Sequence, residues 1–99
     1  IPYNKKYNDF VSIHLGKLKI EYKTKSNIIQ IYNAPEVCSL VINDKVIDQF
    51  FGLVAFPFTL KGEIEEDGKV ILIEAKMGYA NMKLYYNGKL IKKAFMMWG

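Results

Sequence analysis

The sequence predicts an all-β domain, a β-sandwich of about eight antiparallel strands built from two duplicated four-strand halves. Three observations support this fold class: β-branched and aromatic residues are abundant, turn signals recur at close spacing, and the second half repeats the first. The chain carries no convincing apolar stripe of 3.6-residue period, which argues against helices. A closed β-barrel is the alternative that the same pattern allows.

The repeat rests on an alignment without gaps. Residues 39–51 (SLVINDKVIDQFF) align with residues 83–95 (KLYYNGKLIKKAF) at an offset of 44, and the same offset aligns Ile20 with Ile64. The identities are few, but turn signals and apolar alternation recur in the same order in both halves. We therefore divide a single domain, residues 1–99, into an N-terminal extension (1–9), a first repeat half (10–53) and a second repeat half (54–99).

The first strand of each half is expected to be long and bent at a glycine. Apolar residues alternate over 11–15, and the alternation changes frame across Gly16 before it continues over 18–22. A frame change requires a turn or a bulge, and the corresponding stretch of the second half passes Gly62 without a turn signal. We therefore predict a continuous strand with a bulge at the glycine.

Turn and strand signals then follow in the same order in both halves. The polar stretch 24–27 precedes a predicted strand over 28–32, as Asp67-Gly68 precedes a predicted strand over 69–76. Hairpin turns are expected at Asn43-Asp44 and Asn87-Gly88. A tight type I′ turn needs positive φ at both central residues, and Asn-Gly meets this need best.

A chain of this length has space for one hydrophobic core. The alternation assigns to that core the side chains of Val11, Ile13, Ile20, Ile29, Ile31, Leu40, Ile42, Phe51, Phe58, Ile64, Ile71, Ile73, Leu84, Ile91 and Phe95.

Side chains that carry catalysis or bind metals are scarce. His14 is the only histidine and Cys38 the only cysteine. His14 falls on the outward frame of its strand, which is typical of a surface imidazole, and Cys38 lies in an apolar run, where a free thiol packs as a small hydrophobe. Paired catalytic groups and the three or four ligands of a zinc site are both missing, so we predict no catalytic residue, no metal site and no cofactor.

Charge differs between the aligned first strands. The candidate basic face consists of Lys17, Lys19, Lys23 and Lys25, and the candidate acidic face of Glu63, Glu65, Glu66 and Asp67. If the two strands lie close together, these faces form ion pairs within one molecule; if they lie far apart, they favour head-to-tail contact between molecules. The acidic residues lack the alternating ligand loop of calcium motifs and are interpreted as a solvated face.

The end of the chain supplies a candidate partner surface, Met96, Met97 and Trp98. These side chains either close one end of the sandwich itself or contact a partner, because Trp and Met are enriched in interface cores. We therefore expect a non-catalytic structural or protein-interaction module that binds a protein partner or forms a homo-oligomer.

Two other binding functions are alternatives. Exposed tyrosines would suit a carbohydrate, and the space between the sheets would suit an apolar ligand; the tyrosines in question are Tyr3, Tyr7, Tyr79 and Tyr85. The net charge of +4 permits weak nucleic-acid binding through the basic face, but the absence of Arg disfavours it.

Composition also bears on source and compartment. All fourteen basic residues are Lys, a bias that indicates an AT-rich genome and favours a bacterial source. No apolar run approaches the roughly 20 residues that a membrane-spanning helix needs. The chain begins at Ile1 without an initiator Met, so removal of an upstream signal or anchor is a hypothesis that leaves localisation open.

Overall fold

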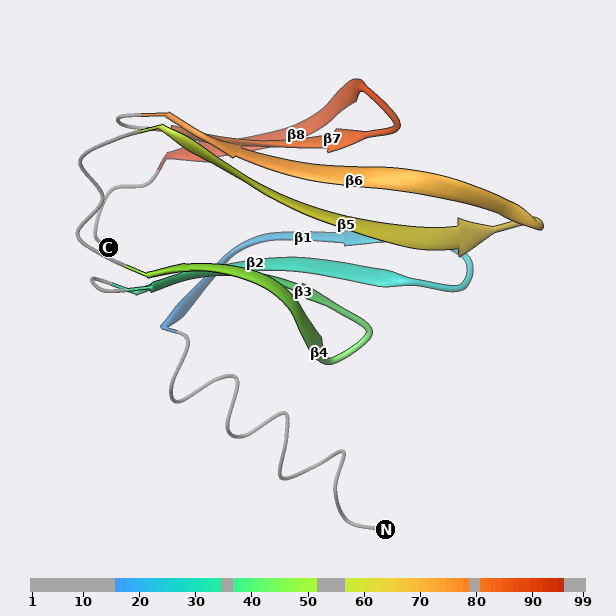
Figure 1. Cartoon of the computed structure of the whole chain (residues 1–99), viewed down its shortest axis with the longest axis horizontal. Helices are drawn as coiled ribbons and strands as arrows, with labels where there is room; N and C mark the ends of the chain where they lie inside the picture. The colour runs from blue at the N-terminus through green and yellow to red at the C-terminus, as the bar shows by residue number, and fades with distance from the viewer. Residues whose placement is uncertain (1–15, 35–36, 52–56, 79–80, 96–99) are drawn as a thin grey trace, which may run out of the picture.

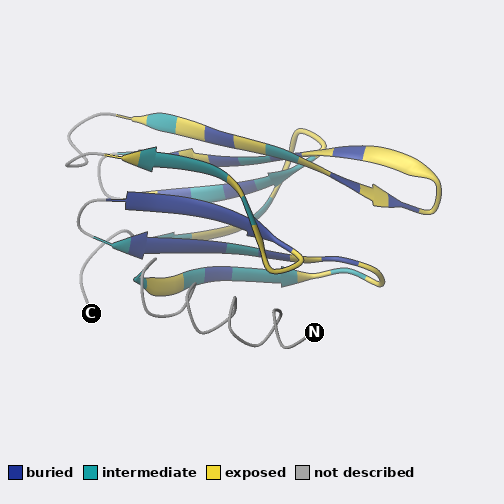
Figure 2. Ribbon diagram, turned by 60° about the horizontal axis from the view of Figure 1, so that its bottom comes forward, coloured by how far each residue is buried: buried dark blue, intermediate teal, exposed yellow. Residues whose placement is uncertain are grey.

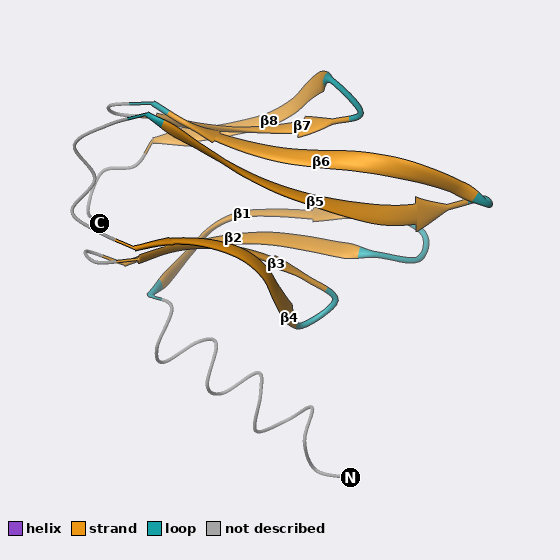
Figure 3. Cartoon of the chain, in the orientation of Figure 1, coloured by secondary structure: helices purple, strands orange, loops and turns teal. Residues whose placement is uncertain are grey.

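The computed structural model describes residues 16–34, 37–51, 57–78 and 81–95. Eight strands run through these residues, and none of the described residues is helical (Figures 1 and 3). The strands are β1 (Lys17–Lys23), β2 (Ile28–Ala34), β3 (Val37–Ile42), β4 (Lys45–Phe51), β5 (Phe58–Glu66), β6 (Lys69–Met77), β7 (Asn81–Tyr86) and β8 (Lys89–Phe95). The described part of the chain accordingly holds no helix long and apolar enough to cross a membrane.

The strands form two four-stranded antiparallel sheets, a first sheet in the order β1-β2-β3-β4 and a second in the order β5-β6-β7-β8. The sheets lie face to face (Figure 1), and buried side chains from both meet in one core. The first strand of each sheet lies against the last strand of the other, β1 against β8 and β5 against β4. Within the described ranges no ladder of hydrogen bonds joins the two sheets. The predicted sandwich is therefore confirmed, and the alternative of a closed barrel is wrong.

The two halves correspond closely over their last two strands. The bounds of β7 and β8 follow those of β3 and β4 at the offset of 44 found in the sequence. The β3–β4 ladder shifts register between Leu40 and Val41, and the β7–β8 ladder shifts between Leu84 and Tyr85, at the same offset. Both connecting turns have positive φ at both central residues, 52° and 66° at Asn43-Asp44 and 52° and 88° at Asn87-Gly88, as predicted for type I′ turns.

Most of the predicted core is buried, as Figure 2 shows along the strands. The confirmed core residues are Ile20, Ile29, Ile31, Leu40, Ile42, Ile64, Ile71, Ile73 and Leu84. Phe58 and Ile91 are half-buried and pack against them. Val11, Ile13 and the side chain of Phe95 lie outside the described part of the chain. Leu60, Met77 and Met82 belong to the core although the prediction omitted them.

Phe51 was expected in the core, and this prediction is wrong, because its side chain is 71% exposed. A regular hairpin closed at Asn43-Asp44 would direct Phe51 inward. Ile47 is instead an extra residue in β4, so Leu40 pairs with Asp48 and Cys38 with Phe50. One inserted residue exchanges the two faces of the rest of the strand. Phe50 consequently packs inward, where its ring stacks on Phe58 with centroids 4.0 Å apart.

The predicted glycine bulges differ from those in the structure. β1 begins after Gly16, whose φ is +87°, and its register shift lies between Leu18 and Ile20. β5 passes Gly62 without any register shift. A Cβ at Gly62 would lie 2.9 Å from Cγ2 of Ile47, so the absence of a side chain there lets the first sheet approach the second. Close packing between sheets, not a bend of the backbone, explains this glycine.

Candidate interaction surface

The four lysines of the predicted basic face do not share one face of β1. Lys19 is the extra residue at the β1 bulge, since Leu18 pairs with Tyr32 and Ile20 with the next residue of β2, Ile31. The bulge reverses the alternation, so Lys17 and Lys23 lie in opposite frames, and Lys25 lies in the turn that follows β1. The even spacing of the four lysines had predicted that they share one face, and the bulge places them on different sides of the strand.

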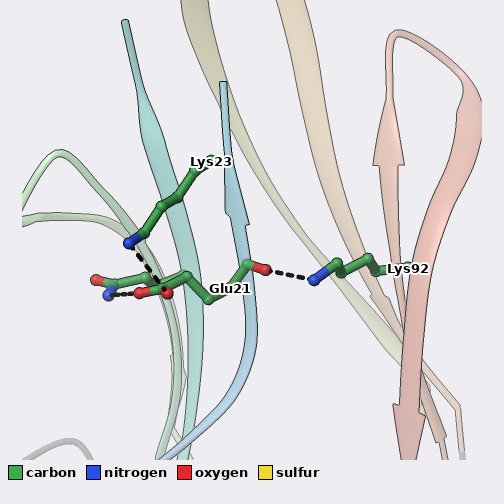
Figure 4. Close-up of polar contacts among 4 residues, drawn as sticks. Glu21, Lys23 and Lys92 are labelled. Carbon is green, nitrogen blue, oxygen red and sulfur yellow. Dashed lines mark hydrogen bonds and ion pairs between the residues drawn. The ribbon is translucent and has the colours of Figure 1, made fainter. Parts of the chain in front are cut away.

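Lys23 lies on the outer face of the first sheet, next to an acidic residue of its own strand. Its Nζ is 3.9 Å from Oε1 of Glu21, and both side chains are solvent-accessible (Figure 4). The other carboxylate oxygen, Oε2, accepts a hydrogen bond of 2.7 Å from the side-chain amide of Gln30. Exposed pairs of this kind contribute little stability, typically under about 1 kcal/mol.

The predicted acidic face is also divided. Glu63 and Glu65 point outward from β5 and are exposed, and Asp67 lies in the β5–β6 turn with φ of 50°. Glu66 was predicted to belong to this exposed face, and this prediction is wrong. Its side chain is buried, on the same side of β5 as Ile64. The alternation that assigned Ile64 to the core also directs Glu66 inward, so the sequence did carry the signal.

Glu66 belongs to a polar clasp of four residues, Thr24, Asn27, Asn43 and Glu66, which joins three turns at one end of the sandwich. Its Oε1 accepts hydrogen bonds from the Thr24 hydroxyl and, at 2.7 Å, from Nδ2 of Asn27. Nδ2 of Asn43 donates to Oδ1 of Asn27 at 2.8 Å. The hydrogen bonds from Thr24 and then Asn27 lower the pKa of Glu66, because they favour its charged form.

The remaining predicted residues are buried or lie outside the described part of the chain. Cys38 is fully buried, as predicted, and burial raises the pKa of its thiol to about 12. Such a thiol is a poor nucleophile, since the thiolate is the reactive form. His14, Tyr3, Tyr7, Tyr79 and the partner surface Met96, Met97 and Trp98 lie outside the described residues. Among those described, no group of three His, Cys, Asp or Glu side chains could hold a metal ion.

Strand pairing assembles a surface that sequence reasoning did not find, which we call the outer face of the second sheet. Three lysines occupy one row across it: Lys76 pairs with Lys83, and Lys83 with Lys93. Neighbouring strands lie about 4.8 Å apart, so the row spans roughly 10 Å. These residues come from three different strands, and only the ladder registers make them neighbours. Like charges directly opposite each other destabilise a sheet, so the stability of the fold does not explain why three lysines share this row.

Apolar, acidic and basic side chains complete this face, the basic one being Lys61, which pairs with Glu74. Leu90 pairs with Tyr85, which in turn pairs with Glu74, and Leu72 pairs with Glu63. The ammonium of Lys76 lies 4.7 Å from the centroid of the Tyr85 ring, a cation–π contact. The surface thus has a basic row at one end, and the next row along the strands holds Lys61, Glu74, Tyr85 and Leu90. Beyond that row, Leu72 lies beside Glu63 and Val70 beside Glu65.

The outer face of the first sheet is covered at its centre, unlike that of the second. Tyr32, Ser39 and Val41 point away from the core and are nevertheless buried. Their counterparts at the offset of 44 are Lys76, Lys83 and Tyr85, which are exposed or only half-buried. The second sheet therefore offers the more accessible of the two outer faces within the described residues.

No protein-family model matches the chain, and neither a curated protein nor a solved structure matches it.

Proposed function

We propose that this domain is a non-catalytic protein-interaction module that presents the outer face of its second sheet to a partner protein. The observation that supports this proposal is the exposure of apolar side chains on that face, Val70 at 62%, Leu90 at 43% and Leu72 at 37%. Apolar side chains flanked by charges are the composition of protein interfaces, in which an apolar centre is surrounded by a polar rim.

The proposal can be tested by in-cell proximity labelling of the chain. Leu72 and Leu90 would both be changed to Glu in the face variant. The matched control changes Leu18 and Phe51 to Glu, because these are exposed apolar side chains on the outer side of the first sheet. We expect the protein neighbours of the wild type to be lost in the face variant and kept in the control. The proposal is contradicted if the face variant keeps the same protein neighbours as the wild type. It is also contradicted if the neighbours of the wild type are nucleic acid alone.

We further propose that the chain arose by duplication of a four-strand unit. The last two strands of each half have matching bounds, bulges and type I′ turns at one offset, which supports a common ancestor for the two halves. The proposed bacterial source rests on composition alone, the use of Lys to the exclusion of Arg. A gene sequence rich in A and T, from a bacterium, would bear out that source, and a GC-rich gene would contradict it.

A further inference from the structure

The basic row of the second sheet, Lys76, Lys83 and Lys93, is not neutralised by the chain around it. None of its ammonium groups forms an ion pair with a carboxylate of the described residues. The next row along the strands holds one basic and one acidic residue, Lys61 paired with Glu74, so its charges balance. The basic row therefore presents a net charge of +3 (three Lys and no acidic residue) at one end of the outer face.

The corresponding row of the first sheet is neutral. At the offset of 44 its residues are Tyr32, Ser39 and Gln49, and Ser39 pairs with both of the others. Nε2 of Gln49 donates a hydrogen bond of 3.0 Å to Oγ of Ser39. The same position of the fold is thus filled by hydrogen-bonded neutral residues in one sheet and by like charges, which repel each other, in the second. A ligand that supplies the missing negative charge would account for this difference.

We infer that the partner of this face is a protein with an acidic segment, whose carboxylates bind the basic row. This inference rests on the proposed interaction function and names the chemistry of the partner. Opposite charges across an interface raise the rate of encounter and select against partners of the wrong sign. A row of three unneutralised ammonium groups would attract an acidic segment and repel a basic one.

The side chains next to the row favour a protein over a nucleic acid. Leu90 and Tyr85 are paired neighbours in the next row, and Leu90 is 43% exposed. A partner segment with carboxylates over the lysines can place apolar side chains on this pair, so that charge and apolar contacts are made together. A nucleic acid that continued along β6 from the basic row would instead bring its phosphates to the carboxylate of Glu74.

The first sheet supplies the variant that tests this inference. K83S/K93Q gives the second sheet the neutral pair that the first sheet carries, Ser39 and Gln49. The probe is a peptide that joins a run of Asp to a run of Leu, titrated into the full chain and followed by amide chemical shifts. In the wild type we expect shifts over 74–76, 83–85 and 90–93 that weaken as salt is added. Binding should be about tenfold weaker in the variant.

Three controls make the titration specific. K23S/K45Q removes the same charge from exposed lysines of the first sheet and should bind like the wild type. A peptide with Asn in place of Asp should not bind. Absence of shifts in the wild type, or equal binding by K83S/K93Q or by the Asn peptide, overturns the acidic partner. Single-stranded DNA of equal charge that binds the row more tightly than the Asp peptide also overturns it.

Stability separates a binding role of the lysines from a role in the fold. We expect K83S/K93Q to unfold at a urea concentration no lower than that of the wild type, because it removes repulsion between opposed lysines. If it is less stable, K83Q/K93Q decides, since glutamine keeps part of the aliphatic stem that lysine packs on the sheet. Loss of binding in this second variant supports the inference, and full binding overturns it.

The labelling experiment distinguishes failure of this inference from failure of the interaction function. Protein neighbours that K83S/K93Q loses together with L72E/L90E support an acidic partner. Neighbours that L72E/L90E loses and K83S/K93Q keeps overturn the acidic partner and leave the interaction function standing. If both variants keep the neighbours of the wild type, both proposals fall.

Discussion

Asp48 and Lys92 hold equivalent places in the two halves and cap opposite edges of the sandwich with opposite charge. Oδ2 of Asp48, on β4, accepts a hydrogen bond of 3.0 Å from the backbone N–H of Lys61 on β5. Nζ of Lys92, on β8, donates one of 2.8 Å to the backbone carbonyl of Glu21 on β1 (Figure 4). Each side chain thus reaches from the last strand of its sheet to the first strand of the other. Edge strands expose unpaired backbone groups, and these contacts satisfy one at each edge.

Removing either cap should weaken the fold modestly. We expect Asp48→Ala and Lys92→Met each to lower the free energy of unfolding by about 0.5–1.5 kcal/mol, at the low end if water replaces the lost partner. Because the caps lie at opposite edges, their effects should add to within about 0.5 kcal/mol in the double variant. Urea denaturation measures all three values, with Lys93→Met as the neighbouring control. Strong coupling between the two sites would contradict independent caps.

The polar clasp should make stability depend on acid pH. Hydrogen bonds hold the pKa of Glu66 below its ordinary value, which is about 4.3 in an unfolded chain. A lowered pKa in the folded state gives a contribution that is complete above the unfolded pKa and is lost as pH falls through the folded one. Glu66→Gln, which cannot ionise, should therefore flatten the acid limb of the stability curve below about pH 4.3.

Unfolding free energies at a series of pH values from neutral to acid would measure this difference between the wild type and Glu66→Gln. Glu63→Gln is the matched control, because Glu63 is exposed on the same strand. An acid limb of equal slope in the wild type and Glu66→Gln would show that the clasp does not set the pH dependence.

The thiol of Cys38 should be protected in the folded protein. Its pKa of about 12 and complete burial leave almost no accessible thiolate near pH 8. We expect an aromatic disulfide reagent to label the native chain far more slowly than the chain in urea. Cys38→Ser should also be less stable than Cys38→Ala by about 1–3 kcal/mol, because it buries a hydroxyl among apolar side chains. Native labelling at the unfolded rate would contradict this burial.

The sequence predicted those features of the fold that depend on neighbours along the chain. The turns at Asn43-Asp44, Asp67-Gly68 and Asn87-Gly88 follow from local pairs, and most core positions follow from alternation within one strand. Bulges could not be located this way, because an extra residue such as Ile47 is defined only against a partner strand. Phe51 was misassigned for that reason.

The candidate surface could not be predicted from the sequence, for a related reason. Lys76, Lys83 and Lys93 are seven or more residues apart in the sequence and become one row only through two ladder registers. The basic and acidic faces, by contrast, were each predicted from a single segment. The bulge at Lys19 divides the basic face, and the inward frame of Glu66 removes that residue from the acidic face. The charge pattern along one strand thus says less about a surface than the pairing between strands does.

Gly62 should not tolerate a side chain, although its strand is regular. A Cβ there would lie 2.9 Å from Cγ2 of Ile47 and 3.1 Å from Cδ1 of Ile42, both on the first sheet. Ile42 is buried and cannot move away freely. Gly→Ala gains some stability by restricting the unfolded chain, typically about 0.4–1 kcal/mol, but overpacking costs about 1–3 kcal/mol. We therefore expect Gly62→Ala to destabilise the domain.

The rescue of this variant identifies the contact. Ile47→Ala removes Cγ2, the nearest atom, and Ile47 lies partly exposed at the β4 bulge. In the background of Gly62→Ala this change should cost less than in the wild type, because it relieves the overlap as well as removing apolar contact. Unfolding free energies of the two single variants and the double variant measure the coupling. Additive effects would mean that the sheets do not approach each other closely at Gly62.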